Sequence, residues 1–410
     1  MKRFTPASLL AVILVCLSGV GKAGADNPPD GLPGLTPDNY PRTDASTSTD
    51  PLNRIIACRL LGLSYEWQPY VMGNGIWEVI PDYSQAPEGF FGERVMASQT
   101  HNSILNLIDG RVDLILSARK MSDDERAYAQ SQGVDLVETP IALDALDFLV
   151  NSQNPVRSLT AGQVRDIYLG NITNWNRVGG ADETIKPFIR NAQSGSQEMM
   201  KEIVMNQAGM PDWEAGLTDE IILTMAQVYD EIIKSPNGIC FTPHYYKEYI
   251  IRDAVGSGQT KSIAIDGVDP DAASIRDRTY PFVAPVYVSV RADLDRGTTA
   301  WQVREWLLTP AGREVIAESG YVPFHDAEEG NETVEGDALR LYPNPMTEGF
   351  YVTGLAHPAR LTLIDAAGRR LLAQEVENNA YIPAQSWPAG LYIAVLSDGK
   401  TRRAVKLLKK

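Results

Sequence analysis

Residues 95–133, VMASQTHNSILNLIDGRVDLILSARKMSDDERAYAQSQG, show a clear succession of secondary-structure patterns. Apolar side chains recur at helical spacing from Ile104 to Ile108, and Gly110 follows as a helix stop. The apolar run Val112–Leu116 is typical of a strand, and a second helical segment covers Asp123–Gln132. A helix, a strand and a helix in direct succession predict an α/β fold.

The same alternation continues along most of the chain in both directions. Helical patterns cover residues 52–61, 198–207, 218–234 and 300–320, and strand patterns cover 134–151, 238–246 and 278–294. A chain of 410 residues exceeds what one hydrophobic core usually spans. We therefore expect two or three folding units, the largest with mostly parallel or mixed sheets.

The C-terminal residues change class. Apolar and polar residues alternate there, with turn signals at 365–368 and 398–399. The alternating apolar positions are Leu361, Leu363, Leu391, Ile393 and Val395. This pattern predicts a small all-β immunoglobulin-like sandwich over residues 341–410. The stretch 326–340 before it is acidic and lacks an apolar face, which is typical of a linker.

The N-terminal 25 residues have the pattern of a secretory signal peptide. Lys2 and Arg3 precede a short apolar run, and small residues at 23–25 mark a cleavage site, so the mature chain is expected to begin at Asp26. A lipoprotein signal at Cys16 is a weaker alternative. Residues 26–42 are expected to form an extended leader ahead of the α/β body, which covers 43–325. After cleavage Cys58 and Cys240 remain, and two buried free thiols are favoured over a disulfide.

Composition excludes several classes of function. The formal net charge of −15 argues against a nucleic-acid partner but not against a small anion in a buried site. The four histidines occur singly, without the spacing of a zinc site, so no metal is expected. Neither an acyl-transfer elbow nor a phosphate-binding P-loop is present, so we expect no catalytic residues. A phosphatase is kept as the weakest option.

Three loops rich in hydroxyl groups each precede a helical pattern. They are residues 46–49, 98–100 and 194–196, and Arg190 stands just before the third. Helix starts offer free N–H donors, and an arginine can hold two oxygens of one anion. Ser and Thr at these positions are also ordinary helix caps, Thr100 or Asn102 among them. The pattern alone leaves both interpretations open.

Residues 42–324 resemble the periplasmic phosphate-binding proteins of phosphate ABC transporters, which have the type II substrate-binding fold. The segments that carry the likeness are DASTSTDPL (44–52), GRVDLILSARKMSDDE (110–125), LTAGQVRDIYLGNITNWNRVGG (159–180), IRNAQSGSQ (189–197), SPNGICFTPHYY (235–246) and WLLTPAGREVIAESGYVPF (306–324). The resemblance implies two lobes joined by hinge strands, lobe 1 over about 43–142 and 280–325 and lobe 2 over about 143–279, with the ligand between them.

The resemblance also implies a ligand and the residues that hold it. The ligand would be inorganic phosphate or a similar tetrahedral oxyanion, without a cofactor. The implied donors are Ser46, Thr47, Ser48, Thr100, Arg190, Ser194, Gly195 and Ser196, with Thr49 as a neighbour because the offset in the first loop is open. The protein is expected to be a monomer.

Two positions depart from the family pattern. Ala118 stands where the family has an aspartate that accepts the proton of hydrogen phosphate, and Ala192 stands where a second aspartate steadies the loop arginine. Asp44 and Asp113 are alternative acceptors, although Asp113 is favoured as a structural residue at a strand end. The choice between phosphate and another oxyanion therefore stays open.

The C-terminal residues resemble the sorting domain of the type IX secretion system of Bacteroidetes. The segments YPNP (342–345), LIDAAGR (363–369) and WPAGLYIAVLSDG (387–399) carry the likeness. It implies that the secretion machinery is a partner and that the protein is exported to the cell surface or beyond, with the periplasm as a transit site. We favour an exported oxyanion-binding protein over delivery to an ABC permease. The rival is an adhesion protein that reuses the fold without a functional cleft.

Overall fold

The computed structural model divides the chain into two units, Met1–His325 and Asp326–Lys410, which are treated separately. The residues described are 31–70, 75–205, 220–253 and 257–324 of the first unit, and 340–342, 346, 349–353, 355, 358–365, 369–377, 380–397 and 402–409 of the second. The predicted signal peptide, the start of the leader, most of the linker and both C-terminal turns lie outside these residues. Of the leader, Tyr40 is buried and packs edge-on against Phe90.

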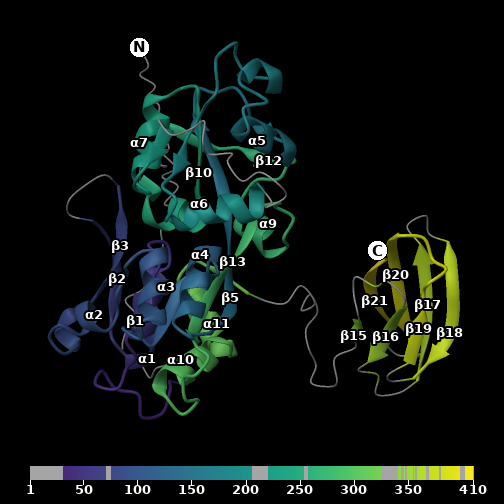
Figure 1. The fold of residues 1–410 in the computed structure, drawn as a ribbon, viewed down its shortest axis with the longest axis horizontal. Helices are drawn as coiled ribbons and strands as arrows, with labels where there is room; N and C mark the ends of the chain where they lie inside the picture. Colours follow the sequence, from purple (N-terminus) through teal and green to yellow (C-terminus); the bar gives the residue numbers. More distant parts are fainter. Residues whose placement is uncertain are drawn as a thin grey trace, which may run out of the picture. The chain divides into compact units, whose positions relative to one another are not determined.

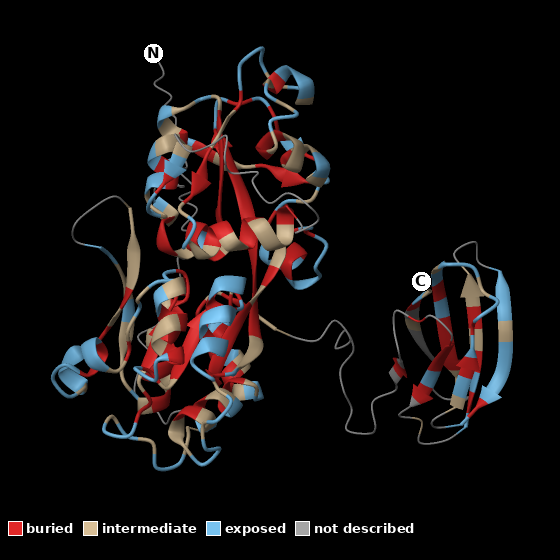
Figure 2. Ribbon diagram, in the orientation of Figure 1, coloured by how far each residue is buried: buried red, intermediate tan, exposed pale blue. Residues whose placement is uncertain are grey.

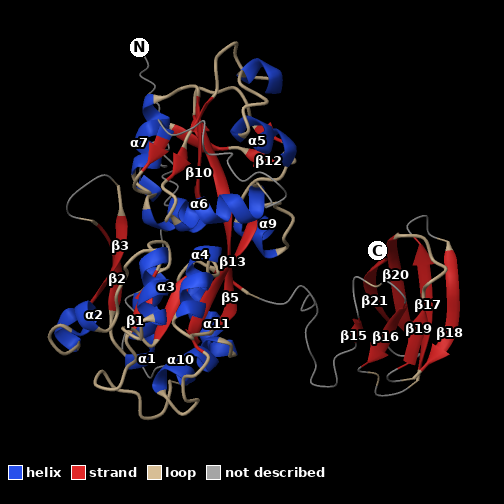
Figure 3. Cartoon of the chain, in the orientation of Figure 1, coloured by secondary structure: helices blue, strands red, loops and turns tan. Residues whose placement is uncertain are grey.

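The largest sheet among the described residues of the N-terminal unit is mixed and runs through both of its halves (Figures 1 and 3). Its order is β1-β4-β13-β5-β10-β7, with β11 and β14 also paired to β5. The strand β5 (Leu136–Asn151) pairs with β13 (Val283–Arg291) along its first part and with β10 (Gly238–Pro243) along its second. The two parts of β5 thus belong to two α/β lobes.

The first lobe surrounds the N-terminal half of β5. The strand β1 (Thr43–Ala45) lies parallel to β4 (Leu114–Ser117), and β4 is antiparallel to β13. Its helices are α1 (Asp50–Leu61), α2 (Phe90–Glu93), α3 (Thr100–Ile108), α4 (Asp123–Ser131), α10 (Thr299–Leu307) and α11 (Pro310–Glu318). The strands of this lobe consist largely of buried residues, and its helices carry both buried and exposed residues (Figure 2). The predicted unit of helix, strand and helix is confirmed by α3, β4 and α4.

The second lobe surrounds the C-terminal half of β5. Its core includes Phe148 and Phe241 from neighbouring strands and Tyr168 from α5 (Ala161–Tyr168), with ring centroids about 6 Å apart. The other helices are α6 (Gly195–Met199), which continues as the π-helix η3 (Met200–Val204), α7 (Gln227–Lys234), η5 (Tyr246–Ile250) and α9 (Ala272–Arg276). As expected, helices and strands alternate along the chain in both lobes.

Short elements complete the N-terminal unit. They are β2 (Tyr65–Pro69), β3 (Trp77–Pro81), η1 (Tyr83–Gln85), β6 (Ser158–Leu159), η2 (Trp175–Val178), β7 (Lys186–Pro187), β8 (Ile189–Arg190), β9 (Ile221–Ile222), β11 (Thr260–Ser262), β12 (Ala264–Ile265) and β14 (Val322–Pro323). Cys58 and Cys240 are both buried and free, as expected. Among the described helices, none combines the length and the apolar character that crossing a membrane requires.

One predicted helix is wrong in part. Residues 218–234 were expected to be helical, but Ile221–Ile222 form β9, parallel to β8, and the helix begins only at Gln227. The backbone of this short strand is paired with Ile189 and Arg190. Pairing with a distant segment has outweighed the local helical pattern.

The C-terminal unit consists of β-strands in its described residues. One sheet has the order β15-β16-β19 and the other β18-β17-β20-β21. The strands are β15 (Arg340–Tyr342), β16 (Gly349–Thr353), β17 (Ala359–Asp365), β18 (Arg370–Val376), β19 (Ala380–Pro383), β20 (Gly390–Ser397) and β21 (Arg402–Lys409). Residues from both sheets form one core, so the all-β prediction is confirmed.

The buried face of β20 is mainly the one opposite to the apolar positions marked in the sequence. Leu391 and Ile393 are exposed, whereas Tyr392, Ala394 and Leu396 face the core. The third marked residue, Val395, is buried. A strand has two faces, and a run that carries apolar residues on both does not reveal which face is buried. In β17 the marked residues Leu361 and Leu363 do lie in the core.

Candidate functional site

One cavity of about 180 Å³ is lined by residues from both lobes of the N-terminal unit. The lining residues are Thr47, Ser48, Gln99, Thr100, Ala118, Arg190, Asn191, Gln193, Ser194, Gly195, Ser196, Leu223, Thr224, Met225, Ala226, Pro243 and Tyr246. Seven of the eight predicted donors are therefore brought together, although they span some 150 positions of sequence. No carboxylate is among the lining residues.

Arg190 is the cation of this cavity. It ends β8, and only 7% of its surface is exposed. Its Nε donates to the carbonyl of Ile222 at 3.1 Å and its Nη2 lies 3.5 Å from that of Leu223, but its buried Nη1 has no partner among the described residues. Burial lowers the pKa of Arg190 to about 10. Even so, the guanidinium keeps its charge at neutral pH.

The first hydroxyl loop, residues 46–49, divides into two pairs. The Ser46 Oγ accepts from the N–H of Ala118 at 3.1 Å, and the Thr49 hydroxyl donates to the carbonyl of Leu116 at 2.7 Å. Both bonds tie the loop to the end of β4. Thr47 and Ser48 line the cavity instead. Ser46 is thus placed as a support of the loop and not on the cavity wall.

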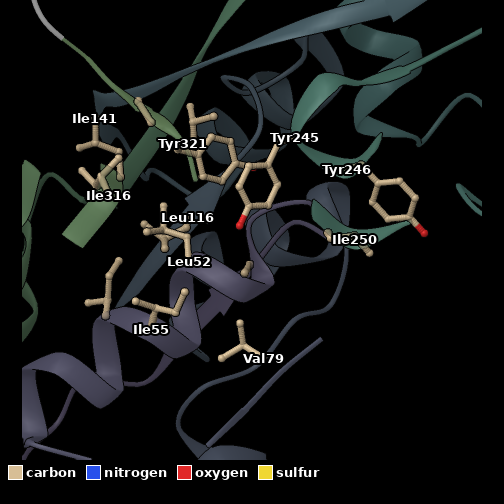
Figure 4. Packing of buried hydrophobic residues seen from close by; sticks show 14 of the residues in the cluster. Leu52, Ile55, Val79, Leu116, Ile141, Tyr245, Tyr246, Ile250, Ile316 and Tyr321 are labelled. Atoms are coloured by element: carbon tan, nitrogen blue, oxygen red, sulfur yellow. The ribbon is translucent and has the colours of Figure 1, made fainter. Parts of the chain in front are cut away.

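Aromatic packing holds the same loop from behind. The ring of Tyr321 stacks on that of Tyr245 with centroids 3.7 Å apart, and the Tyr321 hydroxyl donates to the carbonyl of Ser48 at 3.0 Å. Figure 4 shows these two rings above Leu52, near the start of α1. The loop is therefore anchored to residues that lie more than 190 positions away in sequence.

The second loop is held by a buried carboxylate. Asp44 accepts from the N–H of Ser98 at 2.7 Å and from the side-chain amide of Asn106 at 2.8 Å. The next residue, Gln99, has φ of +72° and ψ of 164°, a backbone region that residues other than glycine rarely adopt. The helix α3 begins at Thr100, so Gln99 is its N-cap, and the prediction that Thr100 or Asn102 caps it is wrong.

The third loop meets the second across the cavity. A Cβ atom built on Gly195 would overlap the Thr100 hydroxyl and lie 3.2 Å from the Thr100 Cβ. Because Gly195 belongs to the second lobe and Thr100 to the first, the missing side chain lets the two lobes approach. The Gln197 amide oxygen accepts from the N–H of Arg190 at 2.8 Å, which links this loop to the arginine.

The helices that start at the three loops differ from five of the other described helices; α2 and α7 also lack a side-chain cap, because their N-caps are Gly89 and Ala226. The N-caps of α1, α3 and α6 make no side-chain capping bond. In contrast, α4, α5, α9, α10 and α11 are each capped by their own side chain, from Ser122, Thr160, Asp271, Thr298 and Thr309. The first amides of the helices at the cavity are thus left without the partner that a Ser or Thr normally supplies.

The two alternative acceptors lie outside the cavity. Asp44 already accepts three N–H donors from the protein, those of Ser98 and Asn106 and its neighbour Ala45. Asp113, which immediately precedes β4, forms an ion pair with Arg42 at 2.6 Å. This pairing agrees with the structural role predicted for it. Ala118 does line the cavity but supplies no polar atom from its side chain.

Some lining residues were not singled out from the sequence. Asn191 and Gln193 lie inside the stretch that links Arg190 to Ser194, so their polar side chains were a usable signal. Thr224 and Tyr246 reach the cavity from other segments, and no local pattern marks them. Within the described part of the chain, no three His, Cys, Asp or Glu side chains are grouped so that they could hold a metal ion.

Comparison with known proteins supplies independent findings. Residues 71–308 match the family model of the PBP superfamily domain, and residues 340–410 match that of the secretion system C-terminal sorting domain. The chain is 24% identical over 243 residues to Protein SphX of Synechococcus elongatus, covering 56% of this chain and 68% of that protein. It is 25% identical over 233 residues to Phosphate-binding protein PstS of Pseudomonas aeruginosa, covering 53% and 70%.

A similar solved structure is the ABC-type phosphate transport receptor from Vibrio cholerae, at 22% identity and a TM-score of 0.47, covering 68% of this chain and 98% of that one. The PBP family model spans more than half of the chain. The chain therefore belongs to the PBP superfamily and carries a C-terminal secretion-system sorting domain.

Proposed function

We propose that the N-terminal unit binds inorganic phosphate, or a similar tetrahedral oxyanion, in the cavity between its lobes and catalyses no reaction. The observation that carries this proposal is Arg190. Its guanidinium is buried, and among the described residues its Nη1 has no hydrogen-bond partner and no carboxylate lies beside it in the cavity.

A buried charge without a counter-charge is costly, and it is normally paired or hydrogen-bonded. An oxyanion would supply both the charge and the acceptor that Arg190 lacks. The proposed contacts are Thr47, Ser48, Thr100, Arg190, Ser194, Gly195 and Ser196, with Ser46 as a support of the first loop. The names of the PstS relatives, which are phosphate-binding proteins, favour the same ligand.

The two lobes would close on the anion through their shared strands. The chain crosses between the lobes in β5, and β13 is paired along the first part of that strand. Contact between Gly195 and Thr100 across the cavity is compatible with a closed state that excludes water. In such a site, the interactions of the anion with neutral donors and with one arginine are strong because the local dielectric constant is low.

Calorimetry on the purified mature protein tests the proposal. Phosphate, arsenate, sulfate and molybdate are titrated separately into the unmodified protein and into Arg190→Ala. At least one anion is expected to bind the unmodified protein, and Arg190→Ala should lose that binding while its circular dichroism spectrum stays unchanged.

A matched control is Arg177→Ala, which removes an exposed arginine of the same lobe outside the cavity. It should bind as the unmodified protein does. The absence of heat with all four anions would contradict the proposed function. Unchanged affinity in Arg190→Ala would place the site elsewhere.

We further propose that the C-terminal unit is an immunoglobulin-like sandwich that directs export by the type IX secretion machinery. The proposed domain limits remain 1–25, 26–42, 43–325, 326–340 and 341–410, with lobe limits near 142 and 280. The mature protein would act at the cell surface or outside the cell as a monomer that scavenges its anion. Delivery to an ABC permease is the less favoured alternative, because the sorting signal would remove the protein from the periplasm.

The rival proposal, an adhesion protein with a non-functional cleft, gains no support from the family matches. It predicts that side chains fill the cleft or that the loops splay apart. The polar cavity around an unpaired arginine favours the binding proposal instead.

A further inference from the structure

The hairpin of β2 and β3 belongs to the first lobe but forms a two-stranded sheet of its own, apart from the main sheet (Figure 1). Such a hairpin is marginally stable by itself and depends on what its faces pack against. Trp67, Trp77 and Val79 share one face, because Trp67 is paired with Val79 and Trp77 stands two positions before it. Val79 anchors this face to the first lobe, since it is buried and its carbonyl accepts from Arg54 of α1 at 3.3 Å.

The segment that meets this face belongs to the second lobe. It follows β10 and precedes β11, and both of these strands pair with the second part of β5. Lys247 of η5 fixes the segment to that sheet. Its Nζ lies 2.7 Å from the Oδ2 of Asp147 in β5 and 2.7 Å from the Oγ of Ser262 in β11. The residues after Lys247 should therefore move with the second lobe.

The two tryptophans of the hairpin contact that segment. The Nε1 of Trp77 donates to the Oδ2 of Asp253 at 2.7 Å, and the guanidinium of Arg252 lies over the Trp77 ring, 3.5 Å from its centroid. Trp67 lies beside Tyr249, with ring centroids 6.5 Å apart. A hydrogen bond to a carboxylate is roughly twice as strong as a neutral one, and indole is the ring that attracts a cation best. These five residues form a clasp between the lobes.

A row of rings connects the clasp to the first hydroxyl loop. Tyr249 stacks on Tyr245 with centroids 4.8 Å apart, and Tyr245 stacks on Tyr321 at 3.7 Å. Tyr321 in turn donates to the carbonyl of Ser48, which lines the cavity. The rings at the two ends of the row come from the first lobe and the two between them from the second. The clasp itself lies outside the cavity, because none of its residues is among those that line it.

We propose that the clasp holds the two lobes together from outside the cavity and slows the release of a bound anion. The effect on release rests on the proposed function, whereas the effect on the lobes does not. An enclosed anion leaves only when the lobes separate, and a contact that is broken on separation raises the barrier to opening. The clasp should therefore act on the dissociation rate more than on the association rate.

The test measures how fast radiolabelled inorganic phosphate leaves the mature protein after dilution into excess unlabelled phosphate. Asp253→Ala removes the acceptor at an exposed residue, and Trp77→Phe keeps a ring but loses the N–H. Each should speed release about fivefold. The double variant should release phosphate no faster than either single one, because both changes remove the same bond. Asp253→Asn, which keeps an acceptor, should stay within about twofold of the unmodified protein.

Trp301→Phe is the matched control. Trp301 is also half-buried, and its ring lies near two guanidinium groups, those of Arg296 at 5.2 Å and Arg304 at 4.9 Å, all within the first lobe. This variant loses an indole N–H without touching the clasp. Its release rate should stay within about twofold of that of the unmodified protein.

Hydrogen exchange tests the clasp without an anion. The backbone amides of residues 46–49 and 194–196 should exchange faster in Asp253→Ala and Trp77→Phe than in the unmodified protein or in Trp301→Phe. Unchanged exchange and unchanged release in both clasp variants would overturn the inference while the proposed function stands. If the unmodified protein binds no phosphate, the proposed phosphate binding fails and the exchange rates decide on the clasp alone. Faster exchange would then support it, and unchanged exchange would overturn it.

Discussion

Two buried arginines of the N-terminal unit differ in what compensates their charge. Arg119 donates from both terminal nitrogens to Glu125, at 2.7 and 2.9 Å, and its charge is neutralised within the protein. Among the described residues, Arg190 bonds only to backbone carbonyls. The charge of Arg119 is thus compensated within the fold, whereas that of Arg190 has no counter-charge in the described part of the chain. Residue type alone does not separate these two roles.

The buried carboxyl group of Asp144 should influence how the stability of the N-terminal unit depends on pH. It lies in β5, where the two lobes join, and is 2% exposed. Its Oδ1 accepts from the N–H groups of Ala145 and Tyr245, but its Oδ2 has no partner among the described residues. Burial raises the pKa of Asp144 to about 6, although those bonds oppose the shift.

Asp144→Asn is predicted to stabilise the N-terminal unit at alkaline pH. The folded carboxyl binds its proton more tightly than the unfolded one, whose pKa is about 3.9, so stability falls as pH rises from about 4 to about 6. Asparagine keeps the Oδ1 bonds without the charge. The gain in unfolding free energy at pH 8 should be on the order of 2 kcal/mol and should vanish near pH 4.

Urea denaturation at pH 4 and pH 8 measures this gain. Asp38→Asn, at an exposed aspartate, is the control and should change stability little at either pH. A loss of stability at pH 8 in Asp144→Asn would contradict the prediction, because it would mean that the buried charge is compensated in the folded protein.

At the scale of elements, the helix starts divide into two kinds. The Thr160 hydroxyl caps α5 by accepting from the N–H of Gln163 at 3.0 Å. In the reciprocal bond, the side-chain oxygen of Gln163 accepts from the N–H of Thr160. Ser194 occupies the same position at α6 but makes no capping bond. The hydroxyl of Ser194 thus makes no capping bond in the described part of the chain, whereas that of Thr160 is committed to its helix.

The two hydroxyls are predicted to respond differently to alanine. Thr160→Ala should lower the unfolding free energy by about 1 kcal/mol and leave anion affinity unchanged. Ser194→Ala should change stability without anion by less than about 0.5 kcal/mol and weaken anion binding about tenfold. Urea denaturation and calorimetry separate the two effects. A destabilisation of Ser194→Ala equal to that of Thr160→Ala would show that Ser194 is only a cap.

At the scale of the whole molecule, the two units have separate cores. The hydrophobic clusters of the N-terminal unit contain no residue beyond Phe324, and that of the C-terminal unit begins at Leu341. Binding and export should therefore be separable properties of the chain.

Removal of residues 326–410 is predicted to leave anion affinity within about twofold of that of the full chain, because every lining residue of the cavity precedes residue 326. The truncated protein should remain inside the cell envelope, whereas the full chain should reach the surface or the medium. Calorimetry and immunoblots of the cell fractions measure the two properties. As a control, an unrelated reporter with the signal peptide and residues 326–410 should be exported. A large change in affinity would show that the C-terminal unit contributes to binding.

Patterns in the sequence were enough to predict the alternation of helices and strands and the all-β C-terminal unit, and the family resemblance implied seven of the residues that line the cavity. Those features depend on patterns over a few neighbouring residues and on a recognisable family frame. The sequence did not separate Ser46 from Thr47 and Ser48, because adjacent hydroxyls differ only in which way the folded loop turns them. It also assigned a helix to Ile221 and Ile222, which pair as a strand with β8.

The folded structure was needed to show that Arg190 lacks a carboxylate partner among the described residues and that the helix starts at the cavity have no side-chain cap. Each of these facts concerns a missing or distant partner. A missing partner cannot be inferred from local pattern, because hydrogen bonds and ion pairs form between segments that the fold brings together from far apart in the chain.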